Sequence, residues 1–560
     1  MTDAMTGAQA TMEALSREGV RLIFGLPGTT IMDLIDAVGE HAEIRYIAVR
    51  HEQVAAFMAD GYARGSGALG VCMASRGPGA ANLSIGIHNA HAEAVPVLAL
   101  VGQVPDALMH RDAFEEMDLL TFFAPVTKWA IEIHESDRIA ELVQRACRTA
   151  VSGRPGAVLV SVPHDVQTRS VPEPVFQPRW RPSPAAPNPV DLEVAAQLLA
   201  QAERPVIVVG GGVRSHDPHI VELAQKLAAP VVTTWLRKGV FPSDSDNALG
   251  ALGYGAVPVT EAVAAEADVV LALGAKFSEF STNKWTLFDR SATFIHVDLD
   301  EHALGRVYVP RVGIQADASL TARNLVELID AGLIDGETDP SAARTKRLVE
   351  LRALYLEQTV APSSSSPAGT VTSRAVLDAL QAFVDVPDSA LVADAPGFGT
   401  WIHRYMTFRH PRSFYGAAGG SMGWGFPAAM GLKLARPEAR VVVVAGDGSF
   451  WMVAQDVETA VREGIAVVIV VMNNFAFGNT RDRQRFSFGE RYNGVFYRNP
   501  DFAEFARMLG AHGERVESDE QFAPALERSL AAGRPAIIDV LQDRMEGLPA
   551  GLVPPGVKRG

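Results

Sequence analysis

Residues 440–449 read RVVVVAGDGS, and residues 466–474 read AVVIVVMNN. Each stretch is an unbroken apolar run followed at once by small or polar residues. Strands that are apolar on both faces are buried on both faces, as in a parallel sheet. A helical pattern at 456–463 lies between the two runs, and this alternation is typical of βαβ units. The two stretches therefore predict a doubly wound α/β domain.

The same alternation occurs in two earlier parts of the chain. Apolar runs bounded by glycine or proline are found at 96–105 (PVLALVGQVP), 205–212 (PVIVVGGG) and 268–274 (DVVLALG). The chain has 560 residues, which is too long for a single core. We predict three doubly wound parallel-sheet domains of the α/β class, separated by stretches rich in proline or small polar residues. The predicted limits are 1–171, 190–345 and 371–545 for the domains, 172–189 and 346–370 for the linkers, and 546–560 for the tail.

Composition excludes several classes of partner. Fifty Lys and Arg stand against 65 Asp and Glu, so the net charge is −15, which argues against nucleic-acid binding. Two cysteines cannot build a disulfide framework. The longest apolar stretches, such as 466–472, are shorter than the roughly 20 residues of a membrane helix, and no signal-peptide pattern is present. We expect a cytoplasmic protein with a small-molecule substrate and without nucleic-acid or membrane partners.

Polar residues follow the two strands predicted within residues 440–449 and 466–474. Gly446, Asp447, Gly448 and Ser449 follow the first strand, and Asn474 follows the second. The glycines let the backbone approach an anion, and N–H groups at a helix N-terminus can bind it. One carboxylate and one amide oxygen are hard ligands, typical of a magnesium ion that also keeps phosphate oxygens. The alternative is a tight turn in which the aspartate caps the helix.

Gly-Asp-Gly followed by Asn-Asn resembles the motif of thiamine diphosphate-dependent enzymes, and within them the acetolactate synthase-like group. The resemblance implies thiamine diphosphate and Mg²⁺ as cofactors, with the main-chain carbonyl of Ala476 completing the metal shell. It covers all three predicted domains. Its other segments are Gly25-Leu26-Pro27-Gly28, His51-Glu52-Gln53, Ala59-Asp60-Gly61-Tyr62-Ala63, Gly102-Gln103-Val104-Pro105 and Ser152-Gly153-Arg154-Pro155-Gly156.

The resemblance also implies a role for Glu52, whose carboxyl group would contact N1′ of the cofactor's aminopyrimidine. A carboxyl group in an apolar cleft has a raised proton affinity and can share its proton with that nitrogen. The cofactor itself then carries the difficult chemistry. Taken alone, Glu52 could instead be a helix N-terminal residue favoured by the macrodipole.

Further cofactor contacts follow from the resemblance. Met422 would be the apolar wedge under the bent cofactor, and the carbonyl of Gly420 would accept a hydrogen bond from its amino group. Gly28 and Gly397 are expected to lie against the cofactor as well. The alternative for Met422 is a residue that fills a gap in the core.

Glu52 and Asp447 fall in different predicted domains. In the family such residues meet across a subunit interface. The resemblance therefore implies a homodimer or a homotetramer built as a dimer of dimers, with each active site at the interface.

The expected substrate pocket departs from that of acetolactate synthases. Glu115 occupies a position that usually holds Gln, so this second carboxylate is expected to act as an acid or base or to reject anionic substrates. It could also be a solvated surface charge. Arg76 replaces a Ser, and Phe114 and His88 are expected to edge the site. Arg481 is expected to bind an anionic group of the substrate, with an ordinary solvated arginine as the alternative.

The middle domain carries glycines at 210–212 and 274 at predicted strand ends. Related enzymes bind FAD or ADP in this domain. No Gly-x-Gly-x-x-Gly frame is present, so a purely structural middle domain is the favoured interpretation. The tail 546–560 is rich in Gly and Pro and is expected to be a lid over the site or disordered.

The resemblance implies a thiamine diphosphate-dependent lyase or transferase of the carboligase type. It would decarboxylate a 2-oxo acid and pass the resulting enamine to an acceptor. The alternative is a decarboxylase or 2-hydroxyacyl lyase acting on a CoA thioester, like oxalyl-CoA decarboxylase, because residues 115–118 (EEMD) occur in that branch. Against this alternative, residues 473–478 (NNFAFG) lack that branch's third Asn. A non-enzymatic nucleotide-binding regulator would not need Glu52, Asp447 and Asn474.

Overall fold

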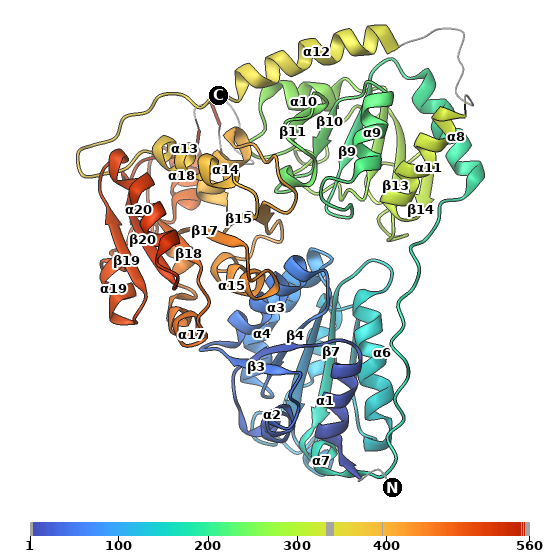
Figure 1. The fold of residues 1–560 in the computed structure, drawn as a ribbon, viewed down its shortest axis with the longest axis vertical. Coiled ribbons are helices and arrows are strands. Elements are labelled where there is room, and N and C mark those ends of the chain that lie inside the picture. Colours follow the sequence, from blue (N-terminus) through green and yellow to red (C-terminus); the bar gives the residue numbers. More distant parts are fainter. Residues whose placement is uncertain (1–3, 332–340, 395, 550, 553, 555–560) are drawn as a thin grey trace.

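The computed structural model describes residues 4–331, 341–394, 396–549, 551–552 and 554. They form three six-stranded sheets, each with helices on its faces (Figure 1). All strand pairs within these sheets are parallel. The prediction of three doubly wound α/β domains is therefore confirmed. No helix within these ranges combines the length and apolar character that a bilayer crossing requires.

The N-terminal sheet has the order β3-β2-β4-β5-β7-β6. Its strands are β2 (Leu22–Gly25), β3 (Arg45–Ala48), β4 (Gly70–Ala74), β5 (Val97–Gln103), β6 (Trp129–Glu132) and β7 (Ala157–Pro163), beside a short antiparallel pair β1 (Met5–Thr6) and β8 (Ser170–Val171). Its helices are α1 (Gly7–Arg17), α2 (Met32–Gly39), α3 (Glu52–Ser66), α4 (Pro78–Ala92), α5 (Leu119–Phe123), α6 (Ile139–Val151) and α7 (His164–Thr168).

The C-terminal sheet has the order β16-β15-β17-β18-β20-β19. Its strands are β15 (Ser389–Ala393), β16 (Phe414–Gly416), β17 (Arg440–Gly446), β18 (Val468–Asn473), β19 (His512–Val516) and β20 (Ala536–Leu541). Its helices are α13 (Ser373–Val384), α14 (Pro396–Tyr405), α15 (Gly425–Ala435), α16 (Asp447–Phe450), α17 (Val457–Arg462), α18 (Gly478–Phe488), α19 (Phe502–Met508) and α20 (Asp519–Ala531).

The N- and C-terminal sheets share one topology. In each, the first strand in sequence lies between the second and the third, so the chain reverses its winding direction beside that first strand. Ligands of open α/β sheets bind at this switch point, outside the carboxyl ends of the strands. The switch points lie between β2 and β4 and between β15 and β17.

The middle sheet has a different order, β11-β10-β9-β12-β13-β14, which is the order of dinucleotide-binding folds. Its strands are β9 (Pro205–Val209), β10 (Val231–Thr233), β11 (Ala248–Ala251), β12 (Val269–Leu273), β13 (Thr293–Asp298) and β14 (Val312–Gln315). Its helices are α8 (Pro189–Gln201), α9 (Pro218–Lys226), α10 (Pro258–Ala265), α11 (Ala318–Asp330) and α12 (Ser341–Gln358).

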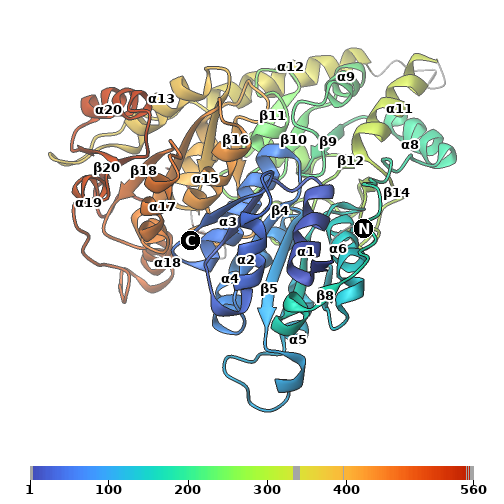
Figure 2. The same cartoon turned by 60° about the horizontal axis from the view of Figure 1, so that its bottom comes forward.

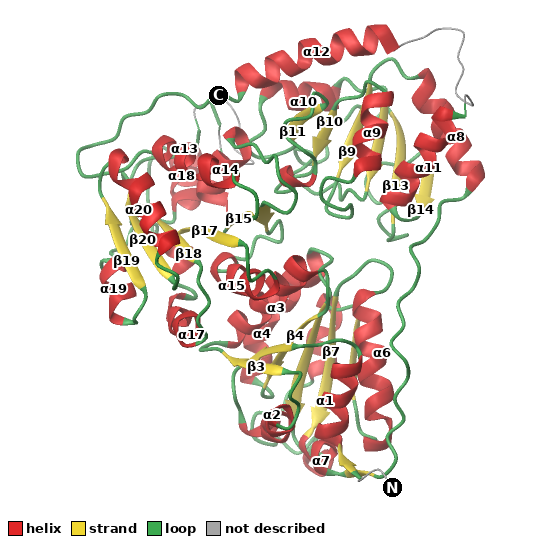
Figure 3. Cartoon of the chain, in the orientation of Figure 1, coloured by secondary structure: helices red, strands yellow, loops and turns green. Residues whose placement is uncertain are grey.

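The two predicted linkers differ in the structure. Residues 172–188 have no helix or strand and run along the side of the molecule between two domains (Figure 3). By contrast, residues 346–358 of the second predicted linker belong to α12. Tyr355 of this helix is buried in the core of the middle domain, and Leu351, one turn earlier, packs against the same core, which stabilises the helix there. The irregular part of the connection begins after α12. The domain limits themselves stay a prediction.

Helices α3 and α15 join the N- and C-terminal domains within one protomer, and one apolar core continues across them. Their backbones approach closely: a Cβ atom at Gly61 would lie 2.1 Å from the carbonyl oxygen of Ala428, and one at Gly431 would lie 2.0 Å from that of Met58. Glycine is therefore required at both positions. Because α3 begins at Glu52, this crossing also fixes the position of that carboxylate.

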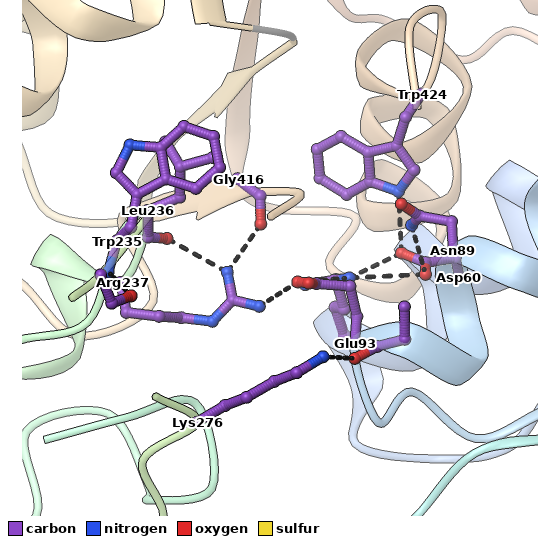
Figure 4. A network of polar contacts seen from close by, with 12 residues as sticks. Asp60, Asn89, Glu93, Trp235, Leu236, Arg237, Lys276, Gly416 and Trp424 are labelled. Atoms are coloured by element: carbon purple, nitrogen blue, oxygen red, sulfur yellow. Dashed lines mark hydrogen bonds and ion pairs between the residues drawn. The ribbon is translucent and has the colours of Figure 1, made fainter. Parts of the chain in front are cut away.

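A buried polar network joins the three domains (Figure 4). Asp60 accepts hydrogen bonds from Trp424 Nε1 at 2.9 Å and from Arg64 Nε at 2.6 Å. Glu93 pairs with Arg64 and with Arg237 of the middle domain. Although burial opposes ionisation, Arg237 and Arg64 hold the pKa of Glu93 below its ordinary value. The network therefore joins charged groups of the N-terminal and middle domains to the indole of Trp424 in the C-terminal domain.

Candidate functional site

A cavity of about 160 Å³ lies at the carboxyl edge of the C-terminal sheet, beside the switch point between β15 and β17. Most of the cofactor and metal residues predicted for this domain line it together. They are Gly397, Met422, Gly446, Asp447, Gly448, Ser449, Asn474 and Ala476, and Arg481 lines it as well. Gly420 precedes Met422 by two residues in the same connection and has a positive φ of 77°.

Asp447 accepts several hydrogen bonds in this cavity. Its side chain is buried, and Oδ1 accepts hydrogen bonds from the backbone N–H of Gly448 and from the hydroxyl of Tyr497, both at 2.8 Å. Oδ2 accepts from the N–H of Phe475 and from Asn499 Nδ2, again at 2.8 Å. Four donors from three segments therefore hold this one carboxylate.

The residues around Asp447 fit a hard divalent cation. Burial raises the pKa of Asp447 to about 6, so ionisation of this carboxylate calls for a compensating positive charge. Asn474 Oδ1 lies within 3.1 Å of the N–H of Ala476, so the predicted amide and carbonyl ligands share one turn of chain. Carboxylate, amide and carbonyl oxygens suit Mg²⁺. Within the described residues, no cluster of three or more His, Cys, Asp or Glu side chains offers a competing site.

Glycines keep the floor of the cavity open. A Cβ atom at Gly446, Gly397 or Gly420 would meet no atom within 4 Å, so space remains beside the backbone there. Gly448 is needed for close packing instead, because a Cβ atom there would lie 2.6 Å from the ring of Phe477. Ser449 accepts a hydrogen bond from the N–H of Gly423 at 2.7 Å, which ties the Met422 segment to the motif. The arrangement leaves room for an anionic group near exposed backbone amides.

Arg481 occupies the cavity wall in a way that the sequence did not predict. Its side chain is 1% exposed, and Nε and Nη2 both donate to Asp482 Oδ1, at 2.9 and 2.7 Å. Nη2 and Nη1 also donate to the backbone carbonyls of Glu546 and Arg544. The guanidinium therefore anchors the segment that precedes the tail, so Arg481 is not an ordinary solvated arginine, and its role in binding an anion stays a prediction. The predicted tail, residues 546–560, lines the cavity through Glu546, Gly547 and Leu548; residues 550, 553 and 555–560 lie outside the described ones.

The N-terminal domain supplies a second cluster at its own switch point. Glu52 is 7% exposed and is the first residue of α3. Its Oε2 accepts a hydrogen bond from Asn82 Nδ2 at 2.9 Å. A Cβ atom at Gly79 would lie 3.1 Å from Oε1, so the glycine leaves this oxygen accessible. Glu52 thus lies at a helix N-terminus, as the alternative interpretation expected. This position is also compatible with a role in binding the cofactor.

The loops after β2, β4 and β5 meet beside Glu52. Gly28 lies against Ser75, which its Cβ would approach to 2.6 Å, and a Cβ at Gly77 would lie 2.5 Å from the carbonyl oxygen of Glu115. Glu115 has a positive φ of 62° and lies in the long segment after β5, which Figure 2 shows extending beyond the rest of the domain. Phe114 is 77% exposed. His88 is exposed on α4, and no contact joins it to this cluster among the described residues.

Within one protomer, Glu52 does not line the C-terminal cavity among the described residues, although its neighbour Gln53 donates a hydrogen bond to the carbonyl of Met452 in the segment after Asp447. The described residues that line the C-terminal cavity lie between 373 and 548, and Glu52 is not among them. Glu52 and Asp447 thus lie at corresponding edges of two sheets with the same topology.

The glycines of the middle domain have a structural explanation. A Cβ atom at Gly210 would lie 2.1 Å from the carbonyl oxygen of Gly274, and one at Gly212 would lie 2.9 Å from its Cα. These glycines let the loops after β9 and β12 contact each other at the switch point. Close packing thus accounts for these glycines, and whether the middle domain binds FAD or ADP stays a prediction.

Sequence reasoning missed Tyr497 and Asn499, which hold Asp447. Both lie in a segment without helix or strand, between α18 and α19, where no periodic pattern marks a residue as important. Asn82 was missed as well, although the helical spacing from Gly79 would have placed it on the same face of α4.

Comparison with known proteins defines the class of this fold and site. Three domain families of thiamine pyrophosphate enzymes match the chain. They are the N-terminal TPP binding domain at residues 5–122, the central domain at 192–325 and the C-terminal TPP binding domain at 394–540. The chain belongs to this family of enzymes.

Particular relatives are similar over almost the whole length. The chain is 35% identical to the probable acetolactate synthase large subunit of Methanocaldococcus jannaschii, over 99% of this chain and 94% of the relative. It is 34% identical to acetolactate synthase large subunit IlvB1 of Mycobacterium tuberculosis, over 96% and 88%. It is 32% identical to the large subunit of acetolactate synthase isozyme 1 of Escherichia coli, over 98% and 96%.

Proposed function

We propose that the chain is a thiamine diphosphate- and Mg²⁺-dependent carboligase that decarboxylates a 2-oxo acid and transfers the remaining carbon unit to an acceptor. The observation that carries the proposal is the buried Asp447, held at the end of β17 beside Asn474 in a cavity lined by open glycines. The acetolactate synthase relatives support a 2-oxo acid as substrate and do not favour the alternative of a CoA thioester.

The C-terminal domain would hold the cofactor by its diphosphate. Asp447, Asn474 and the carbonyl of Ala476 would bind Mg²⁺, and the backbone at Gly446 and Gly448 would approach the phosphate oxygens. Met422 would support the cofactor's rings. When bound, thiamine diphosphate supplies the nucleophilic carbon and delocalises the charge left by carbon dioxide loss.

Glu52 would hold and move the activating proton. Asn82 fixes Oε2, and Oε1 faces the space that Gly79 leaves open. Oε1 is therefore the atom that we propose shares a proton with the pyrimidine nitrogen. Asn82 acts by orienting this carboxylate.

We also propose that the two clusters meet across a homodimer interface, in a dimer or a dimer of dimers. The protomer exposes large apolar side chains near both clusters. In the N-terminal domain these are Ile85, Phe114, Leu120 and Phe122, and in the C-terminal domain they are Trp451, Met452, Phe477 and Phe496. The cytoplasmic location expected from the sequence stays a prediction.

Titration with thiamine diphosphate, with and without Mg²⁺, followed by circular dichroism tests the proposal. Glu52→Gln should retain cofactor affinity but lose exchange of the cofactor's C2 proton measured by NMR. Asp447→Ala should lose the Mg²⁺-dependent part of the affinity, because the carboxylate ligand is gone. Retained exchange in the first variant, or retained Mg²⁺ dependence in the second, would refute the assignment.

The choice of substrate needs a separate assay of carbon dioxide release. Pyruvate and other 2-oxo acids should be turned over, and free CoA should not inhibit. Turnover of an acyl-CoA with inhibition by free CoA would establish the alternative instead.

A further inference from the structure

Residues 417–424 connect β16 to α15 and have no helix or strand. Met422 of this connection lines the cavity, and a Cβ atom at Gly420 would meet no atom of the described residues within 4 Å. Glycine occurs three times in the connection, at 419, 420 and 423, and it leaves the backbone more conformations than any other residue. Contacts from outside the connection therefore decide where Met422 lies.

Both ends of the connection are tied by buried polar side chains (Figure 4). At the start, Arg237 Nη1 donates to the carbonyl of Gly416 at 2.7 Å. At the end, Trp424 is 1% exposed, and its Nε1 donates to Asp60 Oδ1 at 2.9 Å. Arg237 comes from the middle domain and Asp60 from α3 of the N-terminal domain. Two different domains therefore hold the two ends of one stretch of the C-terminal domain.

Charged pairs link these two end contacts into what we call the interdomain network, which consists of Asp60, Arg64, Glu93 and Arg237. Glu93 forms ion pairs with Arg237 and Arg64, and Arg64 Nε donates to Asp60 at 2.6 Å. Although burial opposes ionisation, Asp60 and Glu93 hold the pKa of Arg64 above its ordinary value. Replacing buried ion pairs by apolar side chains is often neutral or stabilising, so stability alone explains the four charges poorly. Charge-assisted hydrogen bonds do, however, set directions, and so fix one geometry.

The middle of the connection lies against α4. A Cβ atom at Gly419 would lie 2.5 Å from Asn89 Oδ1, so the backbone passes this side chain without room for a methyl group. Asn89 is fully buried, and its Nδ2 donates to Asp60 Oδ2 at 3.3 Å. Asp60 therefore holds both Trp424 and the side chain on which Gly419 rests.

We propose that the interdomain network positions residues 417–424 so that Met422 and the carbonyl of Gly420 meet the rings of thiamine diphosphate in the orientation in which its C2 proton can leave. This inference rests on the proposed function. The diphosphate end of the cofactor would be held by Asp447 and Asn474, which lie outside the network. A loosened connection should therefore disturb the orientation of the rings much more than the affinity for the cofactor. The four residues of the network are thus positioning residues.

The first test uses the protein without cofactor and two variants that each release one end. Arg237→Met removes the donor to Gly416, and Trp424→Phe removes the indole N–H but keeps an aromatic ring. Hydrogen–deuterium exchange, measured by mass spectrometry, should become about tenfold faster at the peptide around Gly423, the effect of losing one hydrogen bond of a buried charged group. The N–H of Gly423 donates to Ser449 Oγ, so this amide is protected when the connection is fixed.

Two matched controls lose similar contacts elsewhere. Trp285→Phe loses an indole hydrogen bond of 3.1 Å to the carbonyl of Phe277. Arg352→Met loses the hydrogen bonds of a half-buried arginine to two carbonyls of the middle domain, those of Ser243 and Ala248. Neither control should change exchange at the peptide around Gly423.

The second test uses the protein loaded with thiamine diphosphate and Mg²⁺. In Arg237→Met and Trp424→Phe, exchange of the cofactor's C2 proton, measured by NMR, should be slower by about tenfold or more, because small misplacements at a reacting centre are costly. The Kd for the cofactor should stay within about threefold of the wild-type value. Arg237→Lys should lie between, since it keeps the charge beside Glu93 but loses the planar fork that also reaches Gly416.

A double variant separates positioning from stability. Arg237→Met leaves Glu93 with one partner fewer, and adding Glu93→Gln removes that poorly compensated buried charge. The double variant should regain stability in urea unfolding, but C2 proton exchange should stay slow, because Gly416 still lacks its donor. Recovery of both stability and C2 exchange would overturn the proposal and show that the network only stabilises the fold.

Two further results would overturn the proposal. One is unchanged hydrogen–deuterium exchange around Gly423 in both end variants, and the other is an equal loss of C2 exchange in Trp285→Phe. If the wild type binds no thiamine diphosphate, the proposed function fails and the assignment to the cofactor fails with it. The exchange measured without cofactor then still decides whether the network fixes the connection, so the two failures are distinguishable.

Discussion

Asp447 is held by more donors than a helix cap needs. Tyr497 and Asn499 reach it from a distant segment, and two backbone N–H groups complete the set. Because burial raises the pKa of Asp447 to about 6, the carboxylate is costly to ionise in the absence of a cation. A carboxylate that is both oriented and poorly solvated is suited to bind a metal ion that carries phosphate oxygens.

Tyr497→Phe tests this orientation at the residue scale. We expect Mg²⁺-dependent cofactor affinity to fall by about 10-fold or more, as is usual when a partner that orients a metal ligand is removed. The measurement is a titration with thiamine diphosphate at several Mg²⁺ concentrations. Tyr492→Phe is the control, because the Tyr492 hydroxyl is buried without a hydrogen-bond partner. Equal effects of the two variants would contradict the role of Tyr497.

The residues of the site differ in how far the sequence predicts them. Asp447 and Asn474 follow uniformly apolar strands, so parallel-sheet geometry places them at one edge. The contacts of Arg481 could not be predicted, because they depend on where residues 544–546 return to the domain.

At the scale of elements, the crossing of α3 and α15 positions Glu52. Gly61→Ala should destabilise the protein by about 1–3 kcal/mol or more, since the added methyl group meets the backbone of Ala428 and the helices must separate. Gly39→Ala is the matched control: it is also a helical glycine, but its Cβ would meet no atom within 4 Å. We expect the control to be neutral or slightly stabilising in urea unfolding. Equal midpoints for the two variants would show that the crossing tolerates a side chain.

Helix α12 shows that amino-acid composition alone does not separate a helix from a linker. Residues 361–370, close behind this helix, are small and polar, and composition alone does not show where the helix ends and the linker begins. The helical spacing of Leu348, Leu351 and Tyr355 was the signal that would have separated them. Strands were easier to predict, because a strand buried on both faces is apolar at every position.

At the scale of the whole molecule, Lys238 connects the middle and C-terminal domains. Its Nζ donates to the carbonyl of His403 at 2.8 Å. Burial, with a smaller contribution from the charge of Arg352, lowers the pKa of Lys238 to about 7. Between this value and the ordinary lysine pKa, the unfolded chain binds more protons than the folded one, so stability rises with pH in that window.

Lys238→Met removes this titration. Relative to the variant, the wild type should therefore gain stability from pH 7 to pH 9 and show no such gain below pH 6. Thermal melting of both proteins at several pH values measures the difference. A difference that does not change with pH would contradict the lowered pKa.

The relation between protomers is the feature of the whole molecule that no local pattern encodes. Sequence patterns predict three sheets and two clusters at sheet edges, but which protomer completes which cluster depends on surfaces that form only after folding. The proposal that the complete site lies between two protomers therefore has to be tested on the assembled protein.

Complementation of two inactive variants tests this claim most directly. Glu52→Gln and Asp447→Ala chains, carrying different affinity tags, are co-expressed, and the heterodimer is purified through both tags. If each site joins Glu52 of one protomer to Asp447 of the other, one of the two sites is intact, and about half of the wild-type activity should return. Activity no higher than that of the single variants would place both residues of each site in one protomer and contradict the account.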